Sequence, residues 1–344
     1  MSQPEVHLVA GTAAEAVRIA PVVLAMREQG RLTPIPVATG RDPDAVGRTL
    51  AAFGITPRIT LPSGADEAET MRRFDELWAA RTPAAVIVRD GLAPALAAFW
   101  RRVPVLTIDA GRRTGELGST SALESQRRLL AQVTTVHLAA TPLTAMNLLD
   151  ERVIAGDMLL TGGTAQDAAE FLAARTTSGG HHRAHRLIVL GVPTERAVAI
   201  GPALRYLGGR HRDLEIVQAG DTAPGQDLAT LLAQAYVVIT DDEELVEESL
   251  AAGCPVLMIG LASRHAEALH AGSVHLVDPD PATITSAMAD LLDSRVRRDA
   301  MAAGGNPYGD GLAAYRVAQA TAALLGHGQF PDPMPARPAA GVAR

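Results

Sequence analysis

Short apolar runs rich in Val, Ile and Leu alternate along the chain with longer stretches whose apolar residues recur at helical spacing. This alternation is typical of βα units that build parallel sheets. A first series of predicted strands covers Val6–Ala10, Pro34–Ala38, Ala85–Arg89, Val105–Asp109 and Thr135–Ala139. A second series covers Arg186–Leu190, Leu214–Gln218, Tyr236–Thr240, Pro255–Ile259 and Val274–Val277. The pattern predicts an α/β protein with two doubly wound, Rossmann-like domains that face each other across a cleft.

A polar, Gly-rich segment separates the two series of strands. With 344 residues the chain is long enough for two hydrophobic cores. We predict an N-terminal domain over residues 1–175, a linker over 176–185 and a C-terminal domain over 186–310. A last helix over 311–326 could cross back to the N-terminal domain, and residues 327–344 are expected to be disordered.

Composition and charge exclude several classes of function. The formal net charge is −7 and only 3% of residues are aromatic, whereas nucleic-acid binding needs a basic stripe and stacking rings. Lys and Arg together number 31 and all are arginine, which excludes lysine Schiff bases. No apolar run reaches the ~18 residues of a membrane span, and Met1–Glu5 lacks the basic region of a signal peptide. Because Cys254 is the single cysteine, we expect no disulfide, no cysteine-based zinc site and a cytoplasmic location.

Three motifs carry a family resemblance. Gly-Thr-Ala-Ala-Glu-Ala at Gly11–Ala16 follows the first predicted strand, and Asp-Ala-Gly-Arg-Arg-Thr-Gly begins at Asp109. Asn-Pro-Tyr-Gly-Asp-Gly covers Asn306–Gly311. In this order and at these spacings, the chain resembles the non-hydrolysing UDP-N-acetylglucosamine 2-epimerases, which have the GT-B fold. The resemblance extends from about residue 5 to residue 326.

The resemblance implies an elimination of UDP from a nucleotide-sugar, followed by re-addition after the proton returns to C2 on the opposite face. Such chemistry needs carboxylates and a histidine as acid–base groups, with arginines and helix N-termini holding the diphosphate. The resemblance also implies a homodimer with a small-molecule ligand in the interdomain cleft. We expect no cofactor and no metal ion.

Several groups that the family uses are replaced in this sequence. The arginine of the first loop corresponds to Ala13, the first glutamate of a Pro-Glu-Glu helix start to Leu123, and the histidine of the second domain to Val192. The UDP-binding Ser-Gly-Gly corresponds to Asp242–Glu244. One carboxylate ~4 Å from a phosphate oxygen costs on the order of 4 kcal/mol at an effective dielectric constant near 20. The helix dipole offers only ~0.3–1 kcal/mol in return, so diphosphate binding in the family's manner is not expected.

Other positions keep a group that could serve a site. The family's Gly-Asp pair corresponds to Arg89–Asp90, and the motif glutamate to Asp109. The carboxylates that could carry residual acid–base chemistry are Asp90, Asp109, Glu124 and Glu195. The residues that could bind the ligand are Arg18, Arg113, Arg127, Glu248 and His265.

Simpler roles are open for the same residues. The carboxylates could cap helices or remain solvated. Ion pairs with Glu116 and Glu124 could engage the arginines at 112, 113, 127 and 128. Six acidic residues between Asp241 and Glu248 could bind a divalent ion or a cationic partner, or could only satisfy a helix dipole.

Three functions therefore remain open. The first is a diverged homologue in specialised metabolism, which has lost standard epimerisation and acts on a different ligand. The second is a catalytically inactive protein that supports a protein partner. The third is a still-active epimerase, in which Asp90 and His265 would supply the missing groups.

Overall fold

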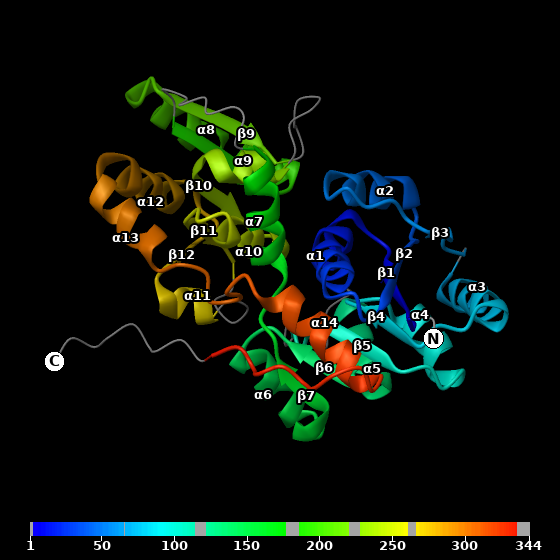
Figure 1. The fold of residues 1–344 in the computed structure, drawn as a ribbon. Coiled ribbons are helices and arrows are strands. Elements are labelled where there is room, and N and C mark those ends of the chain that lie inside the picture. The colour runs from blue at the N-terminus through cyan, green and yellow to red at the C-terminus, as the bar shows by residue number, and fades with distance from the viewer. Residues whose placement is uncertain are drawn as a thin grey trace. The chain divides into compact units, whose positions relative to one another are not determined.

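The computed structural model describes residues 3–64, 66–113, 122–176, 186–219, 228–260 and 266–335. The described residues divide into two compact units, one formed by the residues up to Ala168 together with residues 308–335, the other by those of Ala169–Pro307. Each unit contains one parallel β-sheet with helices on its faces (Figure 1). The predicted α/β class with two Rossmann-like domains is confirmed.

The sheet of the first unit has its described strands in the order β3-β2-β1-β4-β5-β6-β7. Five of them match predicted strands to within one residue at each end: β1 Glu5–Ala10, β2 Thr33–Ala38, β4 Ala85–Val88, β5 Val105–Ala110 and β6 Val136–Ala139. Two short outer strands, β3 Ile59–Thr60 and β7 Met158–Leu160, were not predicted. They are too short for a sequence pattern to develop.

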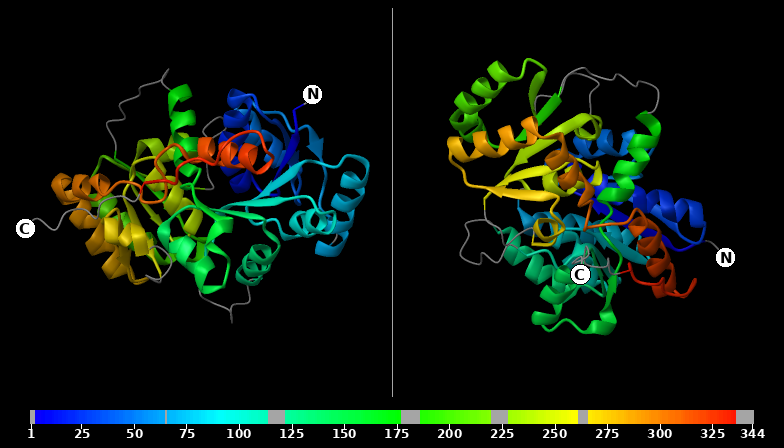
Figure 2. Two further views of the ribbon diagram at one scale, coloured as in Figure 1. Left: turned by 60° about the horizontal axis from the view of Figure 1, so that its bottom comes forward. Right: turned by 90° about the vertical axis from the view of Figure 1, so that its left-hand side faces the viewer.

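Helices cover both faces of this sheet. They are α1 Ala13–Gln29, α2 Pro43–Ala52, α3 Glu67–Ala80, α4 Leu92–Trp100, α5 Leu123–Val133, α6 Pro142–Asp150 and α14 Ala313–Leu324. Helix α7 Ala165–Thr176 begins in this unit and continues into the second. Helix α1 begins where the Thr12 hydroxyl accepts the backbone N–H of Glu15 at 3.1 Å, and it ends at Gly30, whose φ of 62° suits glycine. Helix α14 packs on α1 (Figure 2). The Gln29 side-chain amide donates to the Tyr315 carbonyl at 3.1 Å.

The core of the first unit contains a polar pair. The fully buried Trp78 packs against Phe74 with ring centroids 5.0 Å apart, and its indole N–H donates to His7 Nδ1 at 3.1 Å. Nδ1 of His7 is therefore the acceptor, and the proton of the neutral imidazole lies on Nε2. Burial, with the nearby Arg81 cation adding to it, lowers the pKa of His7 to about 4.

This pair makes the stability of the first unit depend on pH. The pKa of His7 in the folded unit lies below its value of ~6.5 in an unfolded chain. The neutral imidazole therefore adds its full stabilisation above pH ~6.5, and this stabilisation is lost as pH falls toward 4. Between pH 7 and 5 we expect the free energy of unfolding of this unit to fall by about 2 kcal/mol. His7→Gln should abolish this fall, because glutamine does not titrate and its side-chain oxygen still accepts the indole N–H. Both tryptophans, Trp78 and Trp100, belong to this unit, so urea unfolding followed by tryptophan fluorescence measures it alone. Equal pH slopes in both proteins would contradict the assignment.

The second unit has its described strands in the order β12-β11-β10-β8-β9. All match predicted strands to within one residue at each end: β8 Arg186–Gly191, β9 Leu214–Gln218, β10 Ala235–Thr240, β11 Val256–Ile259 and β12 Val274–Val277. The helices are α8 Thr194–Arg210, α9 Leu228–Gln234, α10 Glu243–Ala251, α11 Ala266–Ala271, α12 Pro281–Asp293 and α13 Arg295–Ala303. Apolar side chains of β8, β10, β11, α8 and α12 form its core.

The boundaries differ from those predicted at 175 and 310. The units divide at Ala168 and Pro307. The first boundary therefore lies inside α7, which runs without interruption from Ala165 to Thr176. The disorder predicted from residue 327 is wrong for residues 327–335, which the structure describes. There the Met334 N–H donates to the Leu160 carbonyl at 2.7 Å, and the Met334 side chain is buried beside Gly162. Gly- and Pro-rich composition gives no sign of this pairing with the edge of β7.

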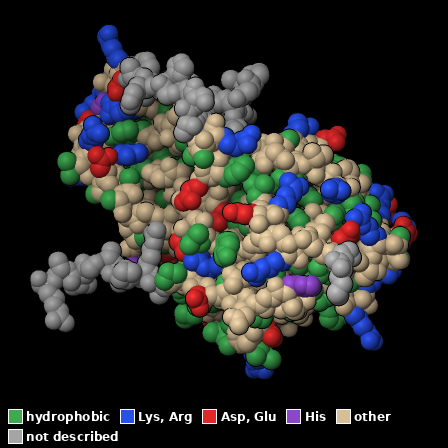
Figure 3. Space-filling view, in the orientation of Figure 1, with side chains coloured by type: hydrophobic (Ala, Val, Ile, Leu, Met, Phe, Trp, Pro, Cys, Tyr) green, Lys and Arg blue, Asp and Glu red, His purple; other side chains and the backbone are tan. Residues whose placement is uncertain are grey.

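On the face drawn in Figure 3, arginine and acidic side chains are interspersed over the described surface. Within the described part of the chain, no helix combines the length and the apolar character needed to cross a membrane.

Candidate functional site

Charged side chains meet at the carboxyl ends of β4 and β5. Arg89 and Asp90 directly follow β4, and Asp109 lies near the end of β5. Arg89 Nε donates to Asp109 Oδ2 at 2.9 Å, and Arg89 Nη1 lies 3.7 Å from Asp90 Oδ2. From α5, Arg127 Nε donates to Asp90 Oδ1 at 2.8 Å. Open α/β sheets bind their ligands at this edge.

The backbone at Asp109 has an unusual conformation. Its φ is 50°, and the register between β5 and β6 shifts between Ile108 and Ala110. Aspartate tolerates the left-handed region better than most residues, yet the conformation still costs about 1–3 kcal/mol. The neighbouring Gly111 has a φ of 83°. Strain of this kind concentrates at functional sites.

Glu15, which the sequence analysis did not select as a site residue, connects two loops at this edge. Its Oε2 accepts the Gly11 N–H at 2.7 Å and its Oε1 accepts the Asp90 N–H at 3.3 Å. Burial raises the pKa of the Glu15 carboxyl, and the charge of Asp90 adds to this effect. Its place in the Gly11–Ala16 motif was the available signal.

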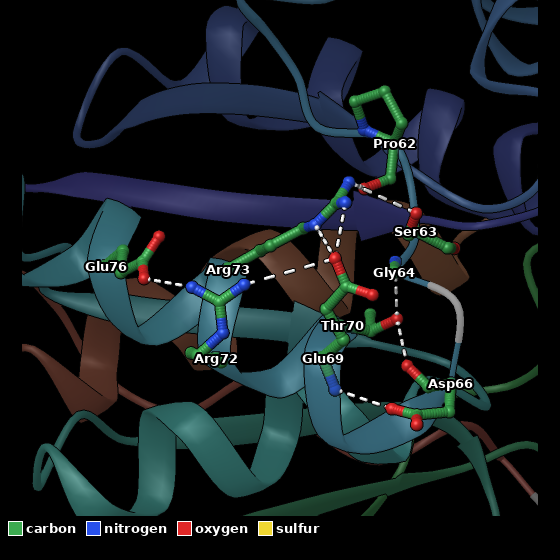
Figure 4. Close-up of polar contacts among 9 residues, drawn as sticks. All are labelled: Pro62, Ser63, Gly64, Asp66, Glu69, Thr70, Arg72, Arg73 and Glu76. Carbon is green, nitrogen blue, oxygen red and sulfur yellow. Dashed lines mark hydrogen bonds and ion pairs between the residues drawn. The ribbon is translucent and has the colours of Figure 1, made fainter.

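The loop after β3 lies next to the same edge and is fixed by α3 (Figure 4). Arg73 Nη1 donates to the carbonyls of Pro62 and Ser63 at 3.0 and 3.2 Å, while Arg73 Nη2 donates to Glu69 Oε1 at 2.6 Å. The Ser63 N–H donates to the Gly40 carbonyl at 3.0 Å. The loops after β2 and β3 are thereby held together.

A pocket that is partly open to solvent lies beneath this charge cluster. The charged side chains in its lining are those of Arg89, Arg112, Arg113, Arg127, Asp90 and Asp109. Carboxylates engage three of these arginines, since Arg89 pairs with Asp109 and Arg127 with Asp90, while Arg113 is bound from outside the lining. Leu130, Ala131 and Leu148 form part of the apolar wall.

His137 also lines the pocket and is a buried, neutral group. Its Nε2 lies 3.0 Å from the Ala131 carbonyl and its Nδ1 lies 3.3 Å from the Asp157 carbonyl. Burial lowers the pKa of His137, so the imidazole adds no positive charge to the pocket at neutral pH.

Arg113 forms an ion pair with a residue that the sequence analysis did not consider. Arg113 Nε and Nη2 donate to the two carboxylate oxygens of Glu151 at 2.7 and 2.6 Å. Arg128 Nε lies 3.6 Å from Glu151 Oε1 and donates to Glu124 Oε1 at 3.0 Å. The ion-pair partner expected for Arg113 was Glu116 or Glu124; the first lies outside the described residues, and the second pairs with Arg128. Sequence spacing could not reveal Glu151 because it comes from the end of α6.

In the second unit, Asp242 caps α10 after β10. Its Oδ1 accepts the N–H groups of Glu244 and Leu245 at 2.7 and 3.1 Å. Asp241 pairs instead with Arg196 Nη1 at 3.2 Å. Over the described residues, no group of three or more His, Cys, Asp and Glu side chains is arranged to hold a metal ion.

The structure brings four of the predicted site residues to the pocket: Asp90, Asp109, Arg113 and Arg127. Two others do not line it, since Arg18 is fully buried within α1 and Glu124 is 2% exposed on α5.

Two predicted residues belong to the second unit, where Glu195 lies in the first turn of α8 and Glu248 in the middle of α10. His265 lies outside the described residues. Val192, at the position of the family's histidine, is 5% exposed and belongs to the core of the second unit.

The two parallel-sheet units place the chain in the GT-B class of folds. A crystal structure of a candidate UDP-N-acetylglucosamine 2-epimerase from Listeria monocytogenes superposes with a TM-score of 0.85 at 26% identity, covering 97% of this chain and 100% of that one. The UDP-GlcNAc 2-epimerase of Neisseria meningitidis, solved with UDP-GlcNAc bound, has the same fold, with a TM-score of 0.80 at 22% identity over 94% of this chain and 100% of that one.

Sequence comparison identifies the family. The model described as UDP-N-acetylglucosamine 2-epimerase matches residues 24–189 and 183–322. The UDP-N-acetylglucosamine 2-epimerase of Escherichia coli is 27% identical over 367 aligned residues, which cover 92% of this chain and 98% of that protein. The enzyme of the same name from Bacillus subtilis is also 27% identical, covering 93% and 95%. This chain belongs to the UDP-N-acetylglucosamine 2-epimerase family.

Proposed function

We propose that this member of the family has lost standard epimerisation of UDP-GlcNAc and acts on a different anionic ligand. The observation that carries this proposal is the cap of α10, where the Asp242 carboxylate accepts two of the N–H groups at the helix N-terminus. The family's UDP-binding Ser-Gly-Gly corresponds to this position. A diphosphate would have to displace or approach a carboxylate there, with a cost on the order of 4 kcal/mol at ~4 Å.

The first unit supports the same proposal. Arg89 stands where the family has glycine, and its guanidinium is hydrogen-bonded to the carboxylate of Asp109. A carboxylate held in a buried ion pair is a weaker proton acceptor than a solvated one, because the neighbouring cation favours its charged form. Asp109 and Asp90 therefore serve better as anchors for arginines that face an anion than as acid–base groups.

Asp242→Ser is the test, because serine caps a helix without a negative charge. We expect ~1 mM UDP to leave the unfolding midpoint of the natural protein unchanged. We expect UDP to raise the midpoint of the variant by a few degrees, because a ligand at about 100 times its dissociation constant adds ~2.7 kcal/mol. Asp280→Ser is the matched control, since Asp280 caps α12 of the same unit through the N–H groups of Ala282 and Thr283.

Turnover distinguishes the proposal from its main alternative. A still-active epimerase is favoured by the relatives of that name, which align over more than nine-tenths of this chain. Conversion of UDP-GlcNAc to UDP-ManNAc by the natural protein, measured by chromatography of the nucleotide-sugars, would overturn the proposal. A midpoint shift by UDP in the natural protein would also contradict it.

A further inference from the structure

Arg113 and Arg128 hold one carboxylate between them in the first unit. Arg113 binds both oxygens of Glu151 in a fork, at 2.7 and 2.6 Å, and Arg128 approaches the first of these oxygens at 3.6 Å. The side chains of Arg113 and Glu151 are only 8% and 17% exposed. This is the geometry with which arginine recognises a free carboxylate or phosphate group.

The pocket and this ion pair share Arg113. Arg113 lines the pocket, whereas Glu151 does not. Arg113 Nη1 also donates to the Arg112 carbonyl at 2.7 Å, and Asn147 Nδ2 donates to the Gly111 carbonyl at 2.9 Å. The loop that carries Arg113 is thus fixed to α6 on one side and faces the pocket on the other.

We propose that this pocket binds a small oxyanion, the phosphate or carboxylate group of a ligand, and that Glu151 is its internal competitor. Without ligand, Arg113 is engaged by Glu151. A ligand oxyanion in the pocket draws the Arg113 guanidinium away, and Arg128 remains as a counter-charge for Glu151. The inference rests on the proposed function, since it names the ligand class, but its test does not involve the UDP position in the second unit.

The proposal predicts that substitutions of Glu151 and Arg113 change the affinity for the anion in opposite directions. Calorimetric titration with inorganic phosphate, and separately with malonate, is performed on the full chain at constant ionic strength. Glu151→Gln removes the competing charge, so we expect the affinity to rise about tenfold. Arg113→Gln removes the recognising group, so we expect a fall of at least tenfold. A purely structural ion pair would weaken binding in both variants or in neither.

Glu5 and Arg81 provide a matched control. They form another two-point ion pair in the same unit, with both distances 2.8 Å, at the start of β1. Glu5→Gln and Arg81→Gln are expected to leave the affinity for both anions unchanged. Arg113→Lys keeps the charge but loses the fork, so its affinity for the anions is expected to lie between those of Arg113→Gln and the natural protein. This variant replaces Arg113→Gln in the test if Arg113→Gln does not fold.

The outcomes distinguish the possible sources of the oxyanion, and they test this inference separately from the proposed function. Preference for phosphate or for malonate assigns the oxyanion to a phosphate or a carboxylate ligand. Absence of saturable binding in both the natural protein and Glu151→Gln overturns the inference, as does equal binding by Glu151→Gln and Arg113→Gln. Epimerase turnover with anion binding intact would overturn only the proposed function.

Discussion

Arg89→Met is expected to lower the free energy of unfolding of the first unit by about 3–5 kcal/mol. The side chains of Arg89 and Asp109 are 1% and 2% exposed, and Arg89 Nε donates to Asp109 Oδ2 at 2.9 Å. Removal of the guanidinium leaves a buried carboxylate without this counter-charge, and desolvation of an ion costs several kcal/mol. Urea unfolding followed by tryptophan fluorescence measures the effect.

Two further variants make this result specific. Arg48→Met breaks an exposed pair, in which Arg48 Nη2 lies 3.7 Å from Asp42 Oδ2 and the side chains are 71% and 64% exposed; we expect a cost below ~1 kcal/mol. The double variant Arg89→Met with Asp109→Asn is expected to recover part of the loss, because it removes both charges. An Arg89→Met cost no larger than that of Arg48→Met would show that the buried pair is unimportant.

Gly111→Ala is expected to destabilise the first unit by about 2–5 kcal/mol. Two effects combine there, since the φ of 83° is unfavourable for alanine by about 1–2 kcal/mol and a Cβ would lie 2.0 Å from the Thr144 carbonyl oxygen. The loop after β5 would have to move away from α6, and overpacking of this kind costs a further ~1–3 kcal/mol.

Gly54→Ala isolates the backbone effect. Gly54 has a similar φ of 71°, but no atom lies within 4 Å of the position that its Cβ would take. We expect this variant to cost about 1–2 kcal/mol. The difference between the two alanine variants, obtained from their urea midpoints, measures the close contact of the loop with α6. Equal costs would show that the contact adds nothing beyond the backbone conformation.

Much of the fold could be predicted because its strands are long apolar runs at the centre of each sheet. A buried parallel strand such as Val256–Ile259 has a continuous apolar signal. The strand Ile59–Thr60 has only two residues at the edge and no such signal. Met334, in the segment 327–335, is held by one backbone hydrogen bond, and its side chain packs beside a glycine. Composition reveals neither contact.

The candidate site was only partly predictable. Asp90 and Asp109 were found because they stand at positions of the family motifs, and parallel strands bring the residues at their carboxyl ends to one edge. Glu151 was missed because its carboxylate reaches Arg113 across 38 positions of sequence, which no local pattern encodes. Whether an arginine faces a ligand or an internal carboxylate depends on tertiary contacts of this kind.

The route of the chain through its two units has a consequence for synthesis on the ribosome. Among the described residues, the second unit is formed by the single stretch Ala169–Pro307, whereas the first includes residues 308–335, with α14 packed against α1. Domains generally fold in the order in which they emerge, beginning at the N-terminus. Here the order of completion is reversed, because the N-terminal unit waits for α14 to be translated after the whole second unit. A stop codon between Pro307 and α14 would therefore damage the half of the protein that is made first.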